Sequence, residues 1–217
     1  LAEEENGVEM ITVVTEDTVQ KGRLLLHKNG PVISKVMTEE NTLRNADGYP
    51  VGGPCIYTPY YERGDVEGAV FEITAAEDIV TAEGTLRVTK DTVICTVATG
   101  SAGDAVISDL YQGNYCITEK KAACGLLRDQ AMQTAEIAYD ESGAVYSEMT
   151  VNFAGERQKV SVHLEKTLSE DKIFGIGKQG EIRDFAFGLF AAEDIYMSDG
   201  SIIPQDGLIE ILRCDEE

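Results

Sequence analysis

The sequence predicts an all-β protein made of tandem antiparallel β-sandwiches, of which the second is truncated. Three observations lead to this prediction. Apolar and polar residues alternate with a period of two in short runs, as they do in half-buried strands. Glycine-containing turn signals separate these runs, and the sequence shows no long amphipathic helix. A nine-residue pattern recurs 116 residues later, which indicates a repeated domain.

The first expected strand lies at residues 24–28, where successive side chains alternate between two faces. Further strands are expected where β-branched and aromatic residues concentrate, at residues 70–73, 92–97, 115–119, 135–139 and 149–153. Turn signals such as Glu83-Gly84 and Ser142-Gly143 lie between them. The order and spacing of these runs are typical of one antiparallel sandwich.

Two pairs of segments define the repeat. Residues 71–79 match residues 187–195 at a spacing of 116, and residues 20–28 match residues 158–166 at a spacing of 138. The spacings differ by 22 residues, so the first unit carries an insertion between its two segments. We expect residues 1–19 to hold the last strand of a preceding repeat or a linker. Residues 20–157 then form a complete β-sandwich with a long insertion at 29–67, and residues 158–217 form the first part of a second β-sandwich repeat of a longer protein.

The composition excludes several classes of partner. Acidic residues outnumber basic residues by 39 to 18, which gives a formal net charge of −21. Nucleic acids and anionic membranes need basic faces, so neither is an expected partner. The chain has no run of 18 apolar residues, so we expect no membrane contact from it. His27, His163 and five cysteines without a C-x-x-C pair give no zinc pattern, and we expect no metal and no cofactor.

The insertion is interpreted as a long exposed excursion from the sheet. It holds four of the five prolines, and Tyr49, Tyr57, Tyr60 and Tyr61 concentrate in it. Exposed tyrosines can form a binding surface. They can also anchor the loop on the sandwich, which is the interpretation that the length of the loop favours. The second unit keeps the flanking motifs without this region, so we expect residues 49–61 to be dispensable for folding.

Three motifs of the first unit carry a family resemblance. They are Gly22-x-Leu24-x-Leu26-x-Lys28, the segment at residues 68–79, and Gly113-Asn114-Tyr115-x-Ile117-x-Glu119-x-x-Ala122. In combination they resemble the SpaA-type pilin and collagen-adhesin B-type repeats of Gram-positive cell-surface proteins. The resemblance implies prealbumin-like, or inverse immunoglobulin, β-sandwiches. It also implies an extracellular, cell-wall-linked stalk or adhesin.

The same resemblance implies a candidate cross-link. Many repeats of this type join a lysine of the first strand to an asparagine of the last strand by an isopeptide bond, with help from a buried glutamate. Burial disfavours the charged ammonium, so the amine becomes a nucleophile, and a protonated glutamate can donate to the amide oxygen. By resemblance, Lys28 takes the position of the lysine and Glu119 that of the acid. Lys166 is the equivalent lysine of the second repeat.

The acceptor asparagine does not carry over to this chain. The family pattern Phe-x-Asn-Glu reads Phe153-Ala154-Gly155-Glu156 here, so Gly155 occupies the acceptor position. Strand alternation places Asn152 on the opposite face. We therefore expect no isopeptide bond in the first unit, and a buried ion pair in its place. Disulfides can replace the missing cross-link, or the thiols can stay reduced, and the sequence leaves both alternatives open.

The leading functional hypothesis is a structural or adhesive stalk module of a bacterial cell-surface protein, located at the cell wall and monomeric. The alternative is a ligand-binding adhesin domain that uses the Tyr-rich insertion to bind a host or neighbouring-cell protein or glycan. An enzyme is not expected, because the sequence has no Ser/His/Asp constellation, metalloprotease motif or phosphate-binding loop.

Overall fold

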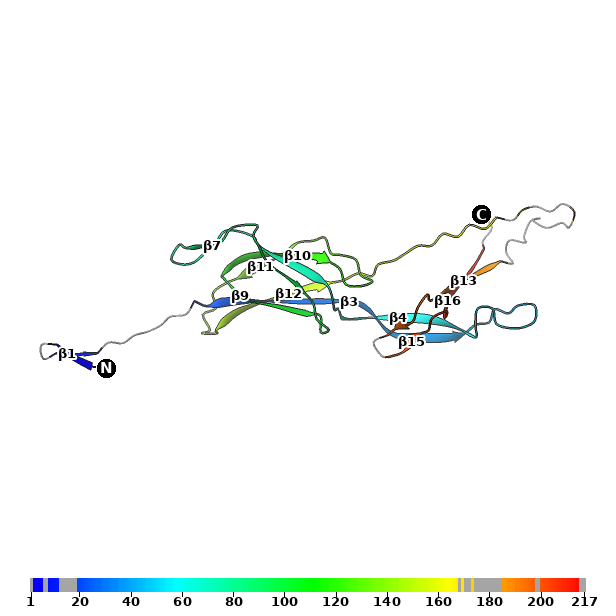
Figure 1. Cartoon of the computed structure of the whole chain (residues 1–217), viewed down its shortest axis with the longest axis horizontal. Coiled ribbons are helices and arrows are strands. Elements are labelled where there is room, and N and C mark those ends of the chain that lie inside the picture. The colour runs from blue at the N-terminus through cyan, green and yellow to red at the C-terminus, as the bar shows by residue number, and fades with distance from the viewer. Residues whose placement is uncertain are drawn as a thin grey trace.

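A computed structural model describes residues 2–5, 8–11, 19–167, 169, 173, 185–197 and 200–214 of the chain. Its regular structure consists of strands, which confirms the all-β prediction (Figure 1). No helix in the described part is long and apolar enough to cross a membrane. The strands are β1 (Ala2–Glu5), β2 (Val8–Ile11), β3 (Lys21–Glu40), β4 (Cys55–Asp65), β5 (Val70–Ala75), β6 (Ile79–Val80), β7 (Leu86–Val88), β8 (Val93–Ala98), β9 (Asp104–Leu110), β10 (Gly113–Lys121), β11 (Gln133–Ile137), β12 (Tyr146–Ala154), β13 (Ala186–Phe190), β14 (Ile195–Tyr196), β15 (Ile202–Ile203) and β16 (Leu208–Arg213).

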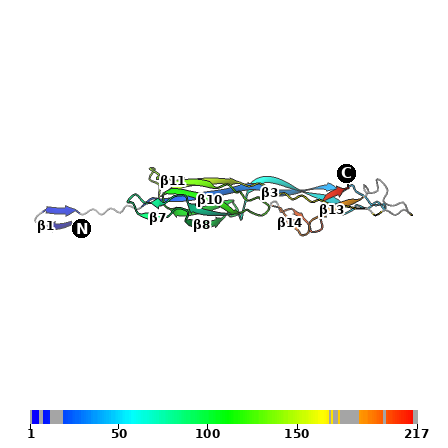
Figure 2. The same ribbon diagram turned by 90° about the horizontal axis from the view of Figure 1, so that it is seen from above.

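The first unit is a sandwich of two sheets. One sheet has the strand order β11-β10-β5-β8, and the other has the order β12-β3-β4 with β9 also paired to β3. Strands β3 and β12, the first and last strands of the unit, run parallel from the pair Tyr146 and Lys21 to the pair Ala154 and Asn29. The other pairings in both sheets are antiparallel. Figure 1 shows the layer with β10 and β11 above the layer with β3, β9 and β12, and Figure 2 shows β11, β10 and β8 of one sheet side by side.

The core between the sheets follows from alternation along three strands. In β3 the side chains of Leu24, Leu26 and Lys28 point inward, and every second residue of β5 and β10 does the same. Phe71 and Ile73 of β5 are fully buried in this core. Lys28 and Glu119 occupy two of these inward positions, so alternation alone carries both ionisable side chains into the apolar interior.

The long insertion, expected as an exposed excursion from the sheet, forms a β-hairpin. Strand β3 continues unbroken beyond the sandwich, and from Asn29 to Glu40 it pairs with β4. We call residues 29–65 the hairpin arm; it extends beyond one end of the sandwich (Figure 1). The β-branched residues Val32, Ile33 and Val36 favour this extended backbone. The prolines and glycines in the insertion obscured that pattern in the sequence.

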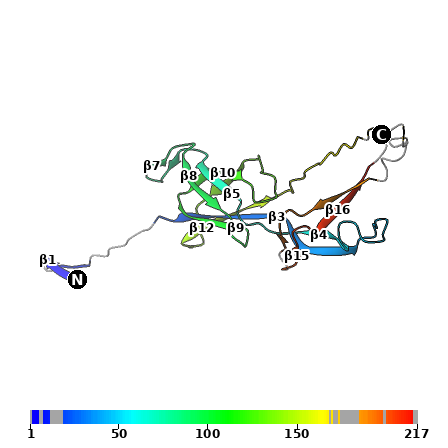
Figure 3. The same cartoon turned by 45° about the vertical axis from the view of Figure 1, so that its right-hand side comes forward.

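The C-terminal strands pack against the hairpin arm and form a second core. Ala191, Met197 and Ile203 are buried there. From the arm, Ile33, Val36 and Tyr57 pack against them. The backbone N–H of Val36 also donates to Ser201 Oγ at 3.3 Å. Figure 3 shows β15 and β16 beside the arm.

These C-terminal strands repeat the pairing of the first unit. β5 pairs with β8 and β6 pairs with β7, while β13 pairs with β16 and β14 pairs with β15. The two matched segments at residues 71–79 and 187–195 therefore adopt the same strand, turn and strand. The assignment of residues 158–217 to a second repeat stays a prediction, which this correspondence supports.

Two parts of the predicted organisation differ from the structure or lie outside it. The segment at residues 158–166 forms no strand, although its counterpart in the first unit is the beginning of β3. Its side chains are exposed. At the other end of the chain, β2 includes Met10 and Ile11 and pairs with β1. Residues 12–18, which belong to the preceding strand or linker expected at residues 1–19, lie outside the described residues.

Candidate functional site

The candidate site is built around Lys28, which is fully buried near the middle of β3. Its backbone is fixed on both sides: the N–H of Lys28 donates to the carbonyl of Gly103 at 2.8 Å, and its carbonyl accepts from the N–H of Val66 at 3.0 Å. Gly103 has a φ of +71°, and a Cβ there would lie 2.5 Å from the Lys28 carbonyl oxygen. Glycine is required at this turn, because any side chain would displace the strand that carries the lysine.

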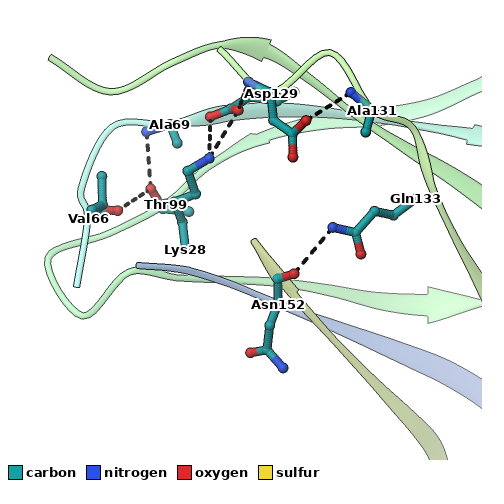
Figure 4. A network of polar contacts seen from close by, with 9 residues as sticks. Lys28, Val66, Ala69, Thr99, Asp129, Ala131, Gln133 and Asn152 are labelled. Carbon is teal, nitrogen blue, oxygen red and sulfur yellow. Dashed lines mark hydrogen bonds and ion pairs between the residues drawn. The ribbon is translucent and has the colours of Figure 1, made fainter. Parts of the chain in front are cut away.

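Glu119 of β10 reaches Lys28 from the opposite sheet. Its side chain is also fully buried, and the Lys28 Nζ lies 3.0 Å from each carboxylate oxygen. Oε2 accepts a second hydrogen bond from the backbone N–H of Asp129 at 2.7 Å. Oε1 contacts Nζ without hydrogen-bond geometry and has no other partner. Figure 4 shows Lys28 and Asp129 converging on this carboxylate. The structure thus brings together the two residues that the sequence singled out.

The surroundings of the pair are apolar. The rings of Phe71 and Phe153 lie 4.5 Å apart between centroids, and the Lys28 Nζ lies 6.0 Å from each ring. Buried Thr99 is satisfied separately: its hydroxyl donates to the Val66 carbonyl at 2.7 Å and accepts from the Ala69 N–H at 3.1 Å (Figure 4). An ion pair in such a medium is strongly attractive, but each charge has lost its hydration. Removal of either partner alone would therefore greatly lower the stability of the folded protein.

Gly155 lies beside the lysine, where the family pattern has the acceptor. A Cβ built on Gly155 would lie 3.4 Å from Lys28 Cε, so a side chain at this position would contact the lysine. The same Cβ would lie only 2.8 Å from Leu126 Cδ1. Leu126 thus fills the space of the missing side chain, and sequence reasoning did not identify this residue. No motif marks it, because its contact with Gly155 arises from a loop that returns to β12.

Asn152 does not replace the acceptor. It is exposed and pairs in register with His27, whereas Phe153 pairs with Lys28. In Figure 4 its side chain points away from the lysine. A lysine and an acid are therefore present in the core, but the amide that they would act on is not beside them.

The four tyrosines of the insertion do not share one environment. Tyr49 at the tip of the hairpin arm is 70% exposed, and Tyr60 is exposed with Lys35 Nζ 4.8 Å from its ring. Tyr57 packs into the second core, and its hydrogen bond with Cys55 raises its pKa. Tyr61 stacks with Arg157 at 4.0 Å. The arm therefore presents Tyr49 and Tyr60 to solvent and uses Tyr57 for packing.

The remaining predicted residues lie apart from this site. Lys166 is exposed, with its Nζ 5.1 Å from the ring of Phe185, so its surroundings differ from those of Lys28. None of the five cysteines forms a disulfide in the structure. Among the described residues, no group of three or more His, Cys, Asp or Glu side chains is arranged to hold a metal ion.

Sequence reasoning also missed a charged cluster on the outer face of β3. His27 Nδ1 lies 2.6 Å from Asp104 Oδ1, and His27 Nε2 lies 3.5 Å from Asp65 Oδ1. The three residues come from β3, β9 and β4, so only the strand pairing brings them together. The cluster ties the hairpin arm to the sandwich next to the point where β4 leaves it.

Comparison with known proteins identifies the fold family. The family described as the SpaA prealbumin-like fold domain matches residues 61–152, which include β5, Glu119 and nearly all of β12. The chain carries a SpaA-type prealbumin-like domain. The match covers the part of the sandwich that holds Glu119 and ends just before Gly155. A search of curated proteins finds no match.

Solved structures with similarity to the chain include several pilins. A minor pilin of Streptococcus agalactiae is 18% identical, with 68% of this chain and 49% of that chain covered and a TM-score of 0.38. The major pilin SpaD of Corynebacterium diphtheriae is 20% identical, with 63% and 30% covered and a TM-score of 0.37. A streptococcal ancillary pilin is 13% identical, with 91% and 52% covered and a TM-score of 0.35. The chain thus spans about half or less of the length of these pilins.

Proposed function

We propose that this chain is a stalk module of a pilin-like protein on the bacterial cell surface, and that it transmits tension along its length. The observation that carries this proposal is the parallel pairing of β3 with β12. The unit is entered at Lys21 and left at Ala154, which lie at opposite ends of this pair. A pull on the two ends therefore loads the ladder along the strands, and its hydrogen bonds share the force. The SpaA-type domain supports the assignment to a cell-surface, extracellular protein.

Single-molecule pulling tests this proposal by changing only the direction of the force. The native cysteines are replaced by serine and handles are attached at Val19→Cys and Glu156→Cys, so that the force shears β3 against β12. In the matched variant the handles are at Val19→Cys and Val145→Cys, which lie at the same end of the pair and peel the strands apart one bond at a time. Val19 and Val145 are 61% and 76% exposed, so both accept a handle. We expect a clearly higher unfolding force in shear, and equal forces would contradict the proposal.

An adhesive role is the second candidate, and the order of the arm tip supports it. Buried Asn41 holds the tip: its side-chain amide donates to the carbonyls of Val51 and Gly53 at 2.6 and 2.8 Å. The Asn45 side chain accepts from the backbone N–H of Tyr49 at 2.9 Å. Tyr49 is thus presented on a loop that is already ordered, which lowers the entropy cost of binding. Protein and glycan arrays probed with the chain and with Tyr49→Ala test this role, because a ligand of the tip is lost only in the variant.

A further inference from the structure

We infer that His27, Asp65 and Asp104 form an acid-dependent latch, which fastens the hairpin arm to the sandwich when His27 is charged. The charged ring bridges the two aspartates, whereas the neutral ring holds only Asp104. This inference goes beyond the stalk function, because it assigns a pH-sensitive joint whether or not the chain carries tension. The three residues belong to β3, β4 and β9, so the charge of one side chain affects how three strands are held together.

The positions of the two ring nitrogens show why the charge of His27 matters. Nδ1 lies 2.6 Å from Asp104 Oδ1, and a carboxylate only accepts hydrogen bonds, so Nδ1 carries a hydrogen. Nε2 lies 3.5 Å from Asp65 Oδ1. In the neutral ring Nε2 then presents a lone pair to this carboxylate, and the contact is repulsive. In the imidazolium both nitrogens donate, and each aspartate faces a positive charge.

The surroundings leave His27 as the cation that the two aspartates share. Among the described residues, neither aspartate forms another ion pair. β12 places Asn152, which is uncharged, opposite His27. Two arginines of β3 and β4 are engaged with other carboxylates, Arg23 with Glu148 and Arg63 with Glu156.

The latch lies next to the backbone hydrogen bonds that hold Lys28. Val66, the residue after Asp65, donates its N–H to the Lys28 carbonyl at 3.0 Å. Gly103, the residue before Asp104, accepts the N–H of Lys28 at 2.8 Å. Each latch residue is therefore the chain neighbour of a residue in this second set. A contact that closes on the outer face of β3 restrains the hydrogen bonds on either side of Lys28.

Mildly acidic solution is the range in which the latch is closed. A histidine ordinarily changes charge between about pH 5 and 8, whereas an aspartate becomes neutral only near about pH 4. The His27 side chain is 30% exposed, so it exchanges protons with the solvent. The contact between His27 and Asp65 is thus favourable on the acid side of the histidine range and is lost as the pH rises through it.

Amide hydrogen exchange of the complete chain tests the latch, with each rate expressed as protection relative to the unfolded chain at the same pH. The amides of Lys28 and Val66 should be about twofold to fivefold better protected at about pH 5.5 than at about pH 7.5, which is the effect of one partly exposed ion pair. His27→Gln should abolish this difference. The matched control is His163→Gln, which changes an exposed histidine away from the latch and should keep the difference. Equal protection at both pH values, or a difference that survives His27→Gln, would overturn the inference.

Asp65→Asn distinguishes the latch from a general effect of histidine charge. The new side chain has the same shape, and its amide can donate to the Nε2 lone pair of the neutral ring. Protection of the Val66 amide should therefore rise at about pH 7.5, and most of its pH dependence should disappear. Nitrogen-15 NMR of the His27 ring gives a direct readout, because at about pH 7.5 the hydrogen must reside on Nδ1. A hydrogen on Nε2, or an unchanged pH dependence in Asp65→Asn, would contradict the latch.

Discussion

At the scale of residues, two features determine what this domain can do chemically. They are the buried pair of Lys28 and Glu119, and the absence of a side chain at Gly155. Lys28 and Glu119 are held 3.0 Å apart in an apolar core. Gly155, beside the lysine, offers no amide, and Leu126 occupies the space. Because no side-chain amide lies beside the lysine, we propose that it forms no covalent bond and that the pair acts through its charge and its packing. Three residue-level predictions follow from these contacts and from the burial of Tyr115.

Replacing either Lys28 or Glu119 alone should lower the free energy of unfolding more than replacing both residues together. Lys28→Met leaves a buried carboxylate without its cation, and Glu119→Leu leaves a buried ammonium without its anion. Either change should lower the free energy of unfolding by about 3–5 kcal/mol. The double variant should be more stable than either single variant, because no uncompensated charge remains. Denaturant unfolding measures all three, and additive losses would show that the two side chains do not interact.

Restoration of the acceptor should restore a cross-link. The natural chain should have the mass of its plain sequence. Gly155→Asn together with Leu126→Ala places an amide next to Lys28 and removes the side chain that blocks it, and Gly155 has no positive φ that an asparagine would strain. We expect this variant to lose the mass of one ammonia, with Glu119 acting as proton donor. Intact-mass spectrometry detects the loss. Adding Lys28→Ala must abolish it, and a loss already present in the natural chain would refute our assignment of Gly155.

Stability should fall at alkaline pH through Tyr115. This side chain is buried, and burial raises its pKa from 10.0 to about 12. Because the folded pKa lies above the unfolded pKa, the contribution of Tyr115 is complete below pH 10. It is lost between about pH 10 and 12, where the unfolded chain ionises first. Thermal unfolding should show a decline over this range that is smaller in Tyr115→Phe. An identical decline in both proteins would assign it to other groups.

At the scale of elements, the long strand β3 connects two cores. Its first half carries Lys28 in the sandwich, and its second half carries Ile33 and Val36 into the core formed with the C-terminal strands. The expectation that residues 49–61 are dispensable for folding therefore applies to the sandwich and not to the second core. Of the arm, Val32 packs against the first core, whereas Ile33, Val36 and Tyr57 pack against the second. Loss of the arm should leave the sandwich folded and release the C-terminal strands.

Ile203→Ala tests this division between the two cores. Ile203 is 1% exposed in the second core, so its truncation should cost that core about 2–5 kcal/mol. Hydrogen exchange should show lost protection in β14, β15 and β16 and unchanged protection in β5 and β10. Val106→Ala, at an exposed position, is the control and should change neither region. Equal loss of protection in both regions would show that the two cores unfold as one unit.

The elements of the sandwich were readable from the sequence because alternation and turn residues are local signals. The pattern at residues 70–73, 92–97 and 115–119 predicted β5, β8 and β10, and strand alternation predicted the exposed position of Asn152. Other features depend on contacts between distant segments. The sequence could not show that Leu126 fills the space beside Gly155, that His27 lies between Asp65 and Asp104, or that the arm is a hairpin. Each of these depends on contacts between separate segments of the chain, and such contacts leave no local sequence pattern.

At the scale of the whole molecule, the domain is one section of an extended rod. The sandwich and the hairpin arm follow one another along the long axis, and the C-terminal strands lie beside the arm (Figures 1 and 3). Continuity of β3 through the sandwich and the arm gives this rod a stiff link in place of a flexible one. The net charge of −21 keeps its surface hydrated and opposes non-specific association.

The central claim is that the hairpin arm holds the C-terminal strands at a fixed position relative to the SpaA-type sandwich. Distances between spin labels at Val106→Cys in β9 and Tyr196→Cys in β14 test it most directly, with the native cysteines replaced by serine. Both positions are exposed, at 53% and 69%, so neither label disturbs a core. The claim predicts one narrow distance distribution that broadens when Ile33→Asp disrupts the second core. A broad distribution in the unaltered arm, or one that Ile33→Asp leaves unchanged, would contradict it.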